Sequence, residues 1–256
     1  MSDGLDELVR TLLHEGWALS ADRAAENTFG VVFPRAWAAC REDALDHVRL
    51  ECVVRAPAEA ELGAAVHFLQ CSDRRVPVER SVAMPRATLE DLAQGLSATF
   101  VFDELHGRVS ATAQRLDGRL ARVVVWVENE TELHPDDARA IARDEALRLS
   151  LLSTHVVLRL SEGRFVSPLE DAGAEGEAVR ACRNVNVWPV PAGSAGEALL
   201  GAALVPSAGL ELDACEVAEL LDTASIEEAL LLHVGSLSDE ERAALAAPEG
   251  AGTGER

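Results

Sequence analysis

The residues best suited to chemistry are a thiol, a guanidinium and an imidazole in the second half of the chain. Cys182 and Arg183 are adjacent in the stretch ACRNVNVWPVP (181–191), and His155 precedes them. The thiolate is the nucleophilic form of cysteine, a neighbouring arginine favours it, and a histidine can act as its base. One hypothesis is therefore an enzyme of unrecognised type that uses Cys182, His155 and Arg183.

The predicted position of Cys182 argues against that hypothesis. We expect a short helix to end near Cys182, where the helix dipole disfavours a thiolate. The spacing alone does not bring Cys182 and His155 together. Five scattered cysteines without a CxxC pair are typical of a reducing cytoplasm, and most of them are expected to be small buried hydrophobes. The favoured interpretation is that Cys182 is packed inside the fold.

A second candidate site is the tetrapeptide HPDD (134–137), with His134, Asp136 and Asp137 as conceivable metal ligands. It resembles the motif that supplies zinc ligands and a base in the LmbE-like deacetylases. There the motif follows a buried parallel strand and further histidines complete the site, whereas here it follows a hairpin strand and only His155 and His233 lie downstream. Zinc needs three or four converging ligands, so we favour a helix entrance with Pro135 in the first turn. We predict no metal and no cofactor.

Charge excludes several classes of partner. All 23 basic residues are arginine and face 44 acidic residues, so the net charge of −21 opposes binding to nucleic acid or to anionic membranes. The N-terminus MSDGLDELVR lacks the basic start and apolar run of a signal peptide, and no apolar run approaches the roughly 20 residues of a membrane helix. We therefore expect a cytoplasmic protein.

The acidic residues are concentrated at the end of the chain. Residues 206–256 hold twelve acidic residues and two arginines, a net charge of −10. Capping-box spacing predicts three helices there, starting at Asp213, Ser225 and Ser238. These helices are either a docking face for a basic protein partner or a solvated surface that keeps the protein soluble. The candidate interaction residues are Glu216, Glu219, Asp222, Glu227 and Glu228.

The first half of the chain reads as antiparallel β structure with a few helices. Apolar residues alternate with charged ones over 47–55, which predicts a strand with one face in solvent. Asp117-Gly118 predicts a two-residue hairpin loop, in which Leu116 opposite Arg119 places Val109 opposite Trp126. Further strands are expected at 29–33, 64–71 and 98–102, and helices at 3–15 and 88–96.

The second half changes to helical spacing. A helix is expected from Pro135 to about Leu152, followed by a second hairpin formed by 155–160 and 164–169. Pro189 and Pro191 restrict the strand near NVWPV to a sheet edge or a strand end. The predicted fold class is α+β: a mainly antiparallel sheet or sandwich-like unit at 1–132, an α+β module at 133–246 and a disordered tail at 247–256.

Four segments, STHVVL, GRFVSPLED, ACRNVNVWPV and TASIEEALLLHVGSLSDEER, resemble an uncharacterised family of bacterial proteins over about residues 143–245. The resemblance implies a recurring C-terminal module and transfers no activity or catalytic residue. This chain departs from that family before the last helices, where LVPSAGLELDACEVAELLD replaces a loop rich in aromatic residues, Asp and Pro. The expectation is an accessory, assembly or scaffold protein that acts by protein binding.

Overall fold

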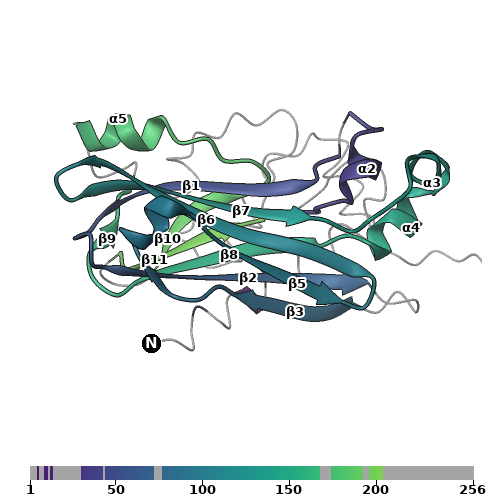
Figure 1. Ribbon diagram of the computed structural model, residues 1–256, viewed down its shortest axis with the longest axis horizontal. Helices are drawn as coiled ribbons and strands as arrows, with labels where there is room; N and C mark the ends of the chain where they lie inside the picture. Colours follow the sequence, from purple (N-terminus) through teal and green to yellow (C-terminus); the bar gives the residue numbers. More distant parts are fainter. Residues whose placement is uncertain are drawn as a thin grey trace, which may run out of the picture.

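Two antiparallel β-sheets lie one above the other in the computed structural model (Figure 1), which describes residues 5, 9–10, 12–13, 30–42, 44–71, 77–167, 174–192 and 196–203. The five-stranded sheet has the order β5-β6-β7-β1-β9, and the six-stranded sheet has the order β10-β11-β8-β2-β3, with β4 also paired to β2. The strands are β1 (His47–Arg55), β2 (Glu61–Cys71), β3 (Pro77–Ala83), β4 (Ala87–Thr88), β5 (Leu96–Phe102), β6 (Leu105–Asp117), β7 (Leu120–Asn129), β8 (Leu152–Leu160), β9 (Arg164–Phe165), β10 (Trp188–Ala192) and β11 (Ala198–Ala202). The predicted antiparallel β structure is confirmed, and the two sheets contain strands from both halves of the chain.

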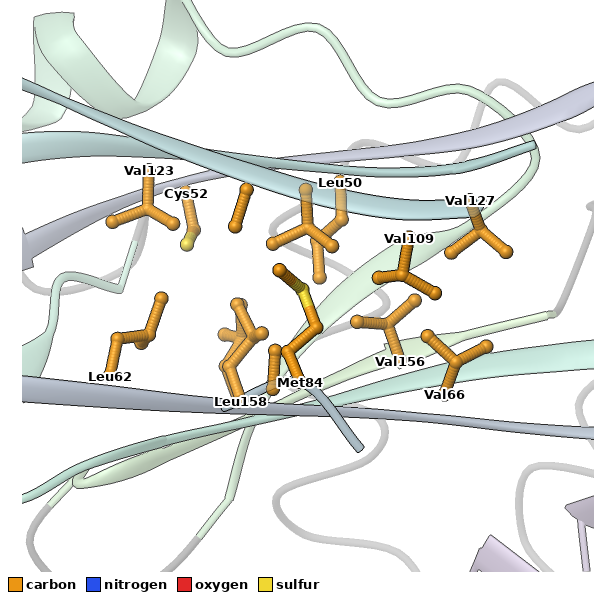
Figure 2. Close-up of a cluster of buried hydrophobic side chains, with 14 of the residues drawn as sticks. Leu50, Cys52, Leu62, Val66, Met84, Val109, Val123, Val127, Val156 and Leu158 are labelled. Carbon is orange, nitrogen blue, oxygen red and sulfur yellow. The ribbon is translucent and has the colours of Figure 1, made fainter. Parts of the chain in front are cut away.

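The core lies between the two sheets, where the period-two patterns bring alternate apolar residues together. Val48, Leu50, Cys52 and Val54 of β1 are all buried in it. Figure 2 shows such side chains meeting others from the opposite sheet, among them Leu62, Val66, Val156 and Leu158. Burying one such Val or Leu side chain contributes about 1.5–3 kcal/mol, so this layer is the main source of stability.

A second apolar cluster covers the outer face of the six-stranded sheet. Val157 of β8 and Leu200 of β11 pack there with Phe33 and Trp37, whose rings stack with centroids 4.4 Å apart. The apolar described residues of the predicted N-terminal helix also join it, and Leu12 and Leu13 are helical and buried. The outer face of the six-stranded sheet is therefore covered along β8, β10 and β11 and at the end of β2.

The hairpin predicted at Asp117-Gly118 is confirmed, but its register is not. Asp117 pairs with Leu120, and a bulge between Arg115 and Asp117 shifts the remaining pairs by one residue. Gly118, with φ of +44°, then occupies the first loop position. Val109 faces Val127 in the core, whereas Trp126 pairs with Ser110 on the outer face. The two-residue loop is therefore Gly118-Arg119, one residue later than predicted, and the extra bulged residue changes which side chains share a face, so pairing outward from Leu116 gave the wrong partners.

The second predicted hairpin is wrong, because β8 and β9 belong to different sheets. β8 pairs with β2 and β11, whereas β9 pairs with β1, so the chain crosses between the layers at 161–163. Both sheets therefore contain strands from either side of the predicted boundary at residue 133. β9 belongs to the sheet of β1, and β8 belongs to the sheet of β2.

The helices of the described residues are short: α2 (Arg35–Ala38), the 3₁₀ turn η1 (Asp91–Gln94), α3 (Pro135–Ala140), α4 (Arg143–Arg148) and α5 (Ala174–Arg180). The single helix expected from Pro135 to Leu152 is interrupted, because Ile141 and Ala142 are extended. The helix expected at 88–96 is reduced to η1, and the strand expected at 29–33 is a bridge from Val32 to Leu151. None of the described helices has both the length and the apolar character that a membrane crossing requires. The helices predicted from Asp213, Ser225 and Ser238 lie outside the described residues.

Candidate functional site

The stretch that contains Cys182 runs alongside β1 at the edge of the five-stranded sheet. α5 ends at Arg180, as predicted, and lies above β1 in Figure 1. Arg49 and Val185 then exchange both backbone hydrogen bonds, at 3.0 and 2.9 Å. Val185 therefore pairs with β1 through an isolated bridge beyond the two residues at which β9 pairs with it.

Glu51 fastens this segment to β1. Its carboxylate is only 4% exposed and accepts a hydrogen bond from the Arg183 backbone N–H at 2.5 Å. Arg49 pairs with the same carboxylate, and the Glu51 N–H donates to Asn184 Oδ1 at 2.7 Å. The alternation of charged residues in β1 predicted that Glu51 faces solvent, and this is wrong because residues 182–184 cover it.

Cys182 is held in its protonated form. Burial raises the pKa of its thiol to about 11, and the negative charge of Glu51 adds to this increase. Arg122 and Arg49 lower the pKa of Cys182 but do not offset burial. The Cys182 Sγ lies 3.5 Å from the Ala178 carbonyl oxygen, one turn earlier in α5. At neutral pH the group is therefore a half-buried, protonated thiol and a poor nucleophile.

Arg183 contacts Glu51 through its backbone and not through its side chain. Its N–H donates to Glu51, while the residue itself is exposed. The cations that favour the Cys182 thiolate are Arg122 and Arg49, so the expectation that Arg183 would activate the thiol is not supported by its position.

His155 lies in the other sheet, on β8. It shares the outer face of the six-stranded sheet with Val157, since Val156 and Leu158 point into the core between the sheets. Its imidazole is 2% exposed; Nδ1 accepts from the Ala203 N–H at 3.1 Å, which leaves Nε2 to donate to Ser153 Oγ at 3.3 Å. Burial first, and then the neighbouring His67, lower the pKa of His155 to about 3.

The structure thus brings Cys182 and Arg183 together and places His155 elsewhere. The groups around Cys182 belong to α5, β1 and β7, whereas those around His155 belong to β2, β8 and residues near Leu12 and Ala203. The two sets share no residue. Proton transfer from the thiol to this imidazole would need donor and acceptor within hydrogen-bond reach, and the observed arrangement does not provide it.

The HPDD motif forms the entrance of α3, as the helix interpretation predicted. His134 is the N-cap, and its Nδ1 accepts from the Asp136 N–H at 3.3 Å. Pro135 occupies the first turn with Asp136 and Asp137. The positive end of the helix dipole stabilises their negative charges. Within the described residues no group of three or more His, Cys, Asp or Glu side chains could hold a metal ion.

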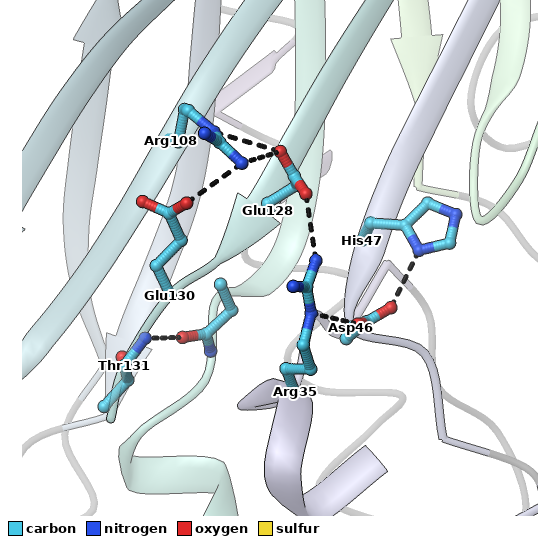
Figure 3. A network of polar contacts seen from close by, with 8 residues as sticks. Arg35, Asp46, His47, Arg108, Glu128, Glu130 and Thr131 are labelled. Atoms are coloured by element: carbon cyan, nitrogen blue, oxygen red, sulfur yellow. Dashed lines mark hydrogen bonds and ion pairs between the residues drawn. The ribbon is translucent and has the colours of Figure 1, made fainter. Parts of the chain in front are cut away.

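A polar network that the sequence did not reveal crosses one end of the five-stranded sheet (Figure 3). It consists of Arg35, Asp46, His47, Arg108, Glu128 and Glu130. Arg35 bridges Asp46 and Glu128 at 3.3 Å each, and Arg108 contacts Glu128 at 2.9 Å. Burial raises the pKa of Asp46, but the hydrogen bond and charge of His47 and the hydrogen bond from Arg35 outweigh it, so the pKa is lowered overall.

In this network two arginines face three carboxylates, and the contacts link α2 to β1, β6 and β7. Partly exposed ion pairs of this kind are worth about 0–1 kcal/mol each. Nearby, the buried Asn129 amide donates to the carbonyl oxygens of Val32 and Leu149 at 2.9 and 2.7 Å, and its oxygen accepts from Thr131. These contacts hold loops and strands of the sandwich together, so we assign the network and Asn129 a structural role.

Glu216, Glu219, Asp222, Glu227 and Glu228, the predicted interaction residues, lie outside the described residues. No protein-family model matches the chain, and no curated protein matches it either.

Proposed function

We propose that the chain acts by binding protein partners, as an accessory, assembly or scaffold component. The observation that carries this proposal is the charge of residues 206–256, where twelve acidic residues accompany two arginines. The sandwich supports it, because Cys182 is a half-buried, protonated thiol and, within the described residues, the hydrogen bonds of the His155 imidazole are structural ones. No contact in this part of the chain favours an enzyme that uses Cys182, His155 and Arg183.

The partner that fits this charge is a basic protein. A net charge of −21 repels the phosphates of nucleic acids and of anionic membranes, and attracts cationic protein surfaces at long range. The cytoplasm is the compartment we propose, and the free thiols of Cys40, Cys52, Cys71 and Cys182 are compatible with it.

The test compares the intact chain with a variant in which the five predicted interaction residues are neutralised, by Glu→Gln at 216, 219, 227 and 228 and Asp→Asn at 222. Each protein is used as bait in a native lysate over a series of salt concentrations. We expect the intact chain to retain a basic protein at low salt and to release it as salt increases, because screening weakens exposed charge pairs. The variant should retain less of that protein. Equal recovery by both baits, or recovery that does not depend on salt, would contradict the proposal.

A further inference from the structure

We infer that the free edge of β5 is a second binding surface, which takes up an extended, uncharged peptide segment flanked by basic residues. The inference deepens the proposed function and rests on it, since it concerns the same kind of activity at a different surface. The strands at which the two sheets end differ in how they are protected, and both ends of β5 carry acidic residues.

Three of the four terminal strands are protected against pairing with another chain. β10 carries Pro189 and Pro191, which lack N–H donors. β9 is two residues long, and Phe165 donates its N–H to the Gly196 carbonyl oxygen. β3 carries the charged residues Glu79 and Arg80. Prolines, short strands, covering segments and charges are the usual means by which proteins block an exposed edge.

β5 has none of these protections. Its sequence LSATFVF contains no proline and no charge, and it pairs with β6 over seven residues without a bulge. Ser97, Thr99 and Val101 are exposed, and Val101 is 62% exposed, whereas Phe100 is buried in the core. A β-prone edge strand of this length is a ready template for one more strand.

The backbone groups of β5 that would bind such a strand can be assigned from the hairpin. Phe102 pairs with Leu105, so the loop is two residues long, and the residues that flank such a loop exchange both hydrogen bonds. The pattern repeats at every second residue, which directs the N–H and C=O groups of Ser97, Thr99 and Val101 away from β6. In the described part of the chain, no backbone hydrogen bond outside the sheet involves these three residues.

The charges around β5 select the partner. Glu90 and Asp91, exposed in the turn that leads into β5, and Asp103 and Glu104 in the loop that follows it, make both ends acidic. The Asp103 side chain is 78% exposed even though Arg80 lies 3.5 Å away. Antiparallel pairing of β5 with a second copy would place the acidic residues of one copy beside those of the other, which is unfavourable. A strand with Arg or Lys on both sides of an uncharged centre is complementary.

The probe is a synthetic peptide in which Thr and Val alternate over the length of β5, with two arginines at each end and blocked termini. Binding of the fluorescently labelled peptide to the full chain is measured by anisotropy at low ionic strength. Two control peptides replace the arginines by glutamates or methylate alternate backbone nitrogens. We expect each control to bind about tenfold more weakly or worse, because it loses charge complementarity or several hydrogen bonds.

Two variants of the chain test the location. Thr99→Pro removes an outward N–H and should abolish binding, whereas Thr99→Ala changes only the side chain and should preserve it. Circular dichroism and thermal unfolding check that Thr99→Pro folds; should it not fold, the backbone-methylated peptide makes the same test on the unaltered chain. Equal binding to both variants, equal binding of the methylated peptide, or no binding of the arginine peptide would overturn the inference.

Two further measurements separate this surface from its alternatives. The chain neutralised at 216, 219, 222, 227 and 228 should bind the peptide as tightly as the intact chain does, and loss of binding there would assign the peptide to the acidic segment. Sedimentation of the intact chain should show no dimer that depends on β5. A dimer that Thr99→Pro disrupts would show that a second copy is the occupant and would overturn the assignment of a basic partner.

Discussion

Lowering the pH from about 7.5 to about 5 is expected to destabilise the protein through His155, because the folded chain resists protonation of this imidazole. The pKa of His155 is about 3 in the folded state, against an ordinary value of 6.5. The unfolded chain therefore binds the proton first as the pH falls. The contribution of the neutral imidazole to stability is complete above pH 6.5 and is lost progressively as the pH falls toward 3.

The size of the effect follows from the two pKa values. At pH 5 almost all unfolded chains carry the proton and almost no folded chains do, so the free energy of unfolding falls by about 2 kcal/mol. The full shift in the pKa corresponds to about 5 kcal/mol, reached only near pH 3. Either figure is a large fraction of the stability of an ordinary domain, about 5–15 kcal/mol.

The assay is urea unfolding at both pH values for the original chain and for His155→Asn. The asparagine side chain can still accept the hydrogen bond from the Ala203 N–H that Nδ1 accepts now, but it does not titrate. The variant controls for the many carboxylates, whose titration affects both proteins alike. We expect the original chain to lose about 2 kcal/mol more than the variant between the two pH values. The same loss in both proteins would refute the assignment of His155 as a buried neutral imidazole.

Three further predictions concern the thiol, the core and the buried carboxylate. Cys182, whose thiol has a pKa of about 11, should react with iodoacetamide much more slowly than the exposed Cys40, as mass spectrometry can follow; faster labelling of Cys182 would instead favour a reactive site. Gly107→Ala should cost about 1–3 kcal/mol in thermal unfolding, because the new Cβ meets a phenylalanine ring of β5, whereas Gly63→Ala, with its nearest atoms 3.6 Å away, should be nearly neutral. Glu51→Gln should lower the free energy of unfolding in urea by about 1–3 kcal/mol by weakening charge-assisted hydrogen bonds, and an unchanged value would argue against its fastening role.

Local patterns predicted the elements of the sandwich that depend on neighbouring residues. The alternation in β1 gave its core face, Asp117-Gly118 gave the β6–β7 hairpin, and the two prolines of β10 gave an edge strand. HPDD likewise has the composition of a helix entrance and forms one. In each case the physical cause lies within a few residues of the signal.

Features that depend on distant segments were not predictable in this way. The bulge at the end of β6 shifts the register without a composition signal. β9 pairs with β1, about 110 residues earlier in the chain, rather than with β8, which precedes it directly. Glu51 has the pattern of a solvent-facing residue and is buried only because residues 182–184 lie over it. No signal in the sequence near Glu51 indicates that contact. The same holds for the separation of Cys182 from His155, which follows from strand order.

Because β2 pairs with β8, the sheet that contains β2 cannot be completed until late in synthesis. β2 lies between β3 and β8 in its sheet, and Leu62 pairs with Leu160 far downstream. While a ribosome is still translating the intervening residues, one side of β2 and the apolar surface above it have no neighbours. Contacts between such remote parts of a chain slow folding and expose sticky intermediates. We therefore expect nascent chains that stop before β8 to need chaperone protection. Chains from which the last strands have emerged should no longer need it.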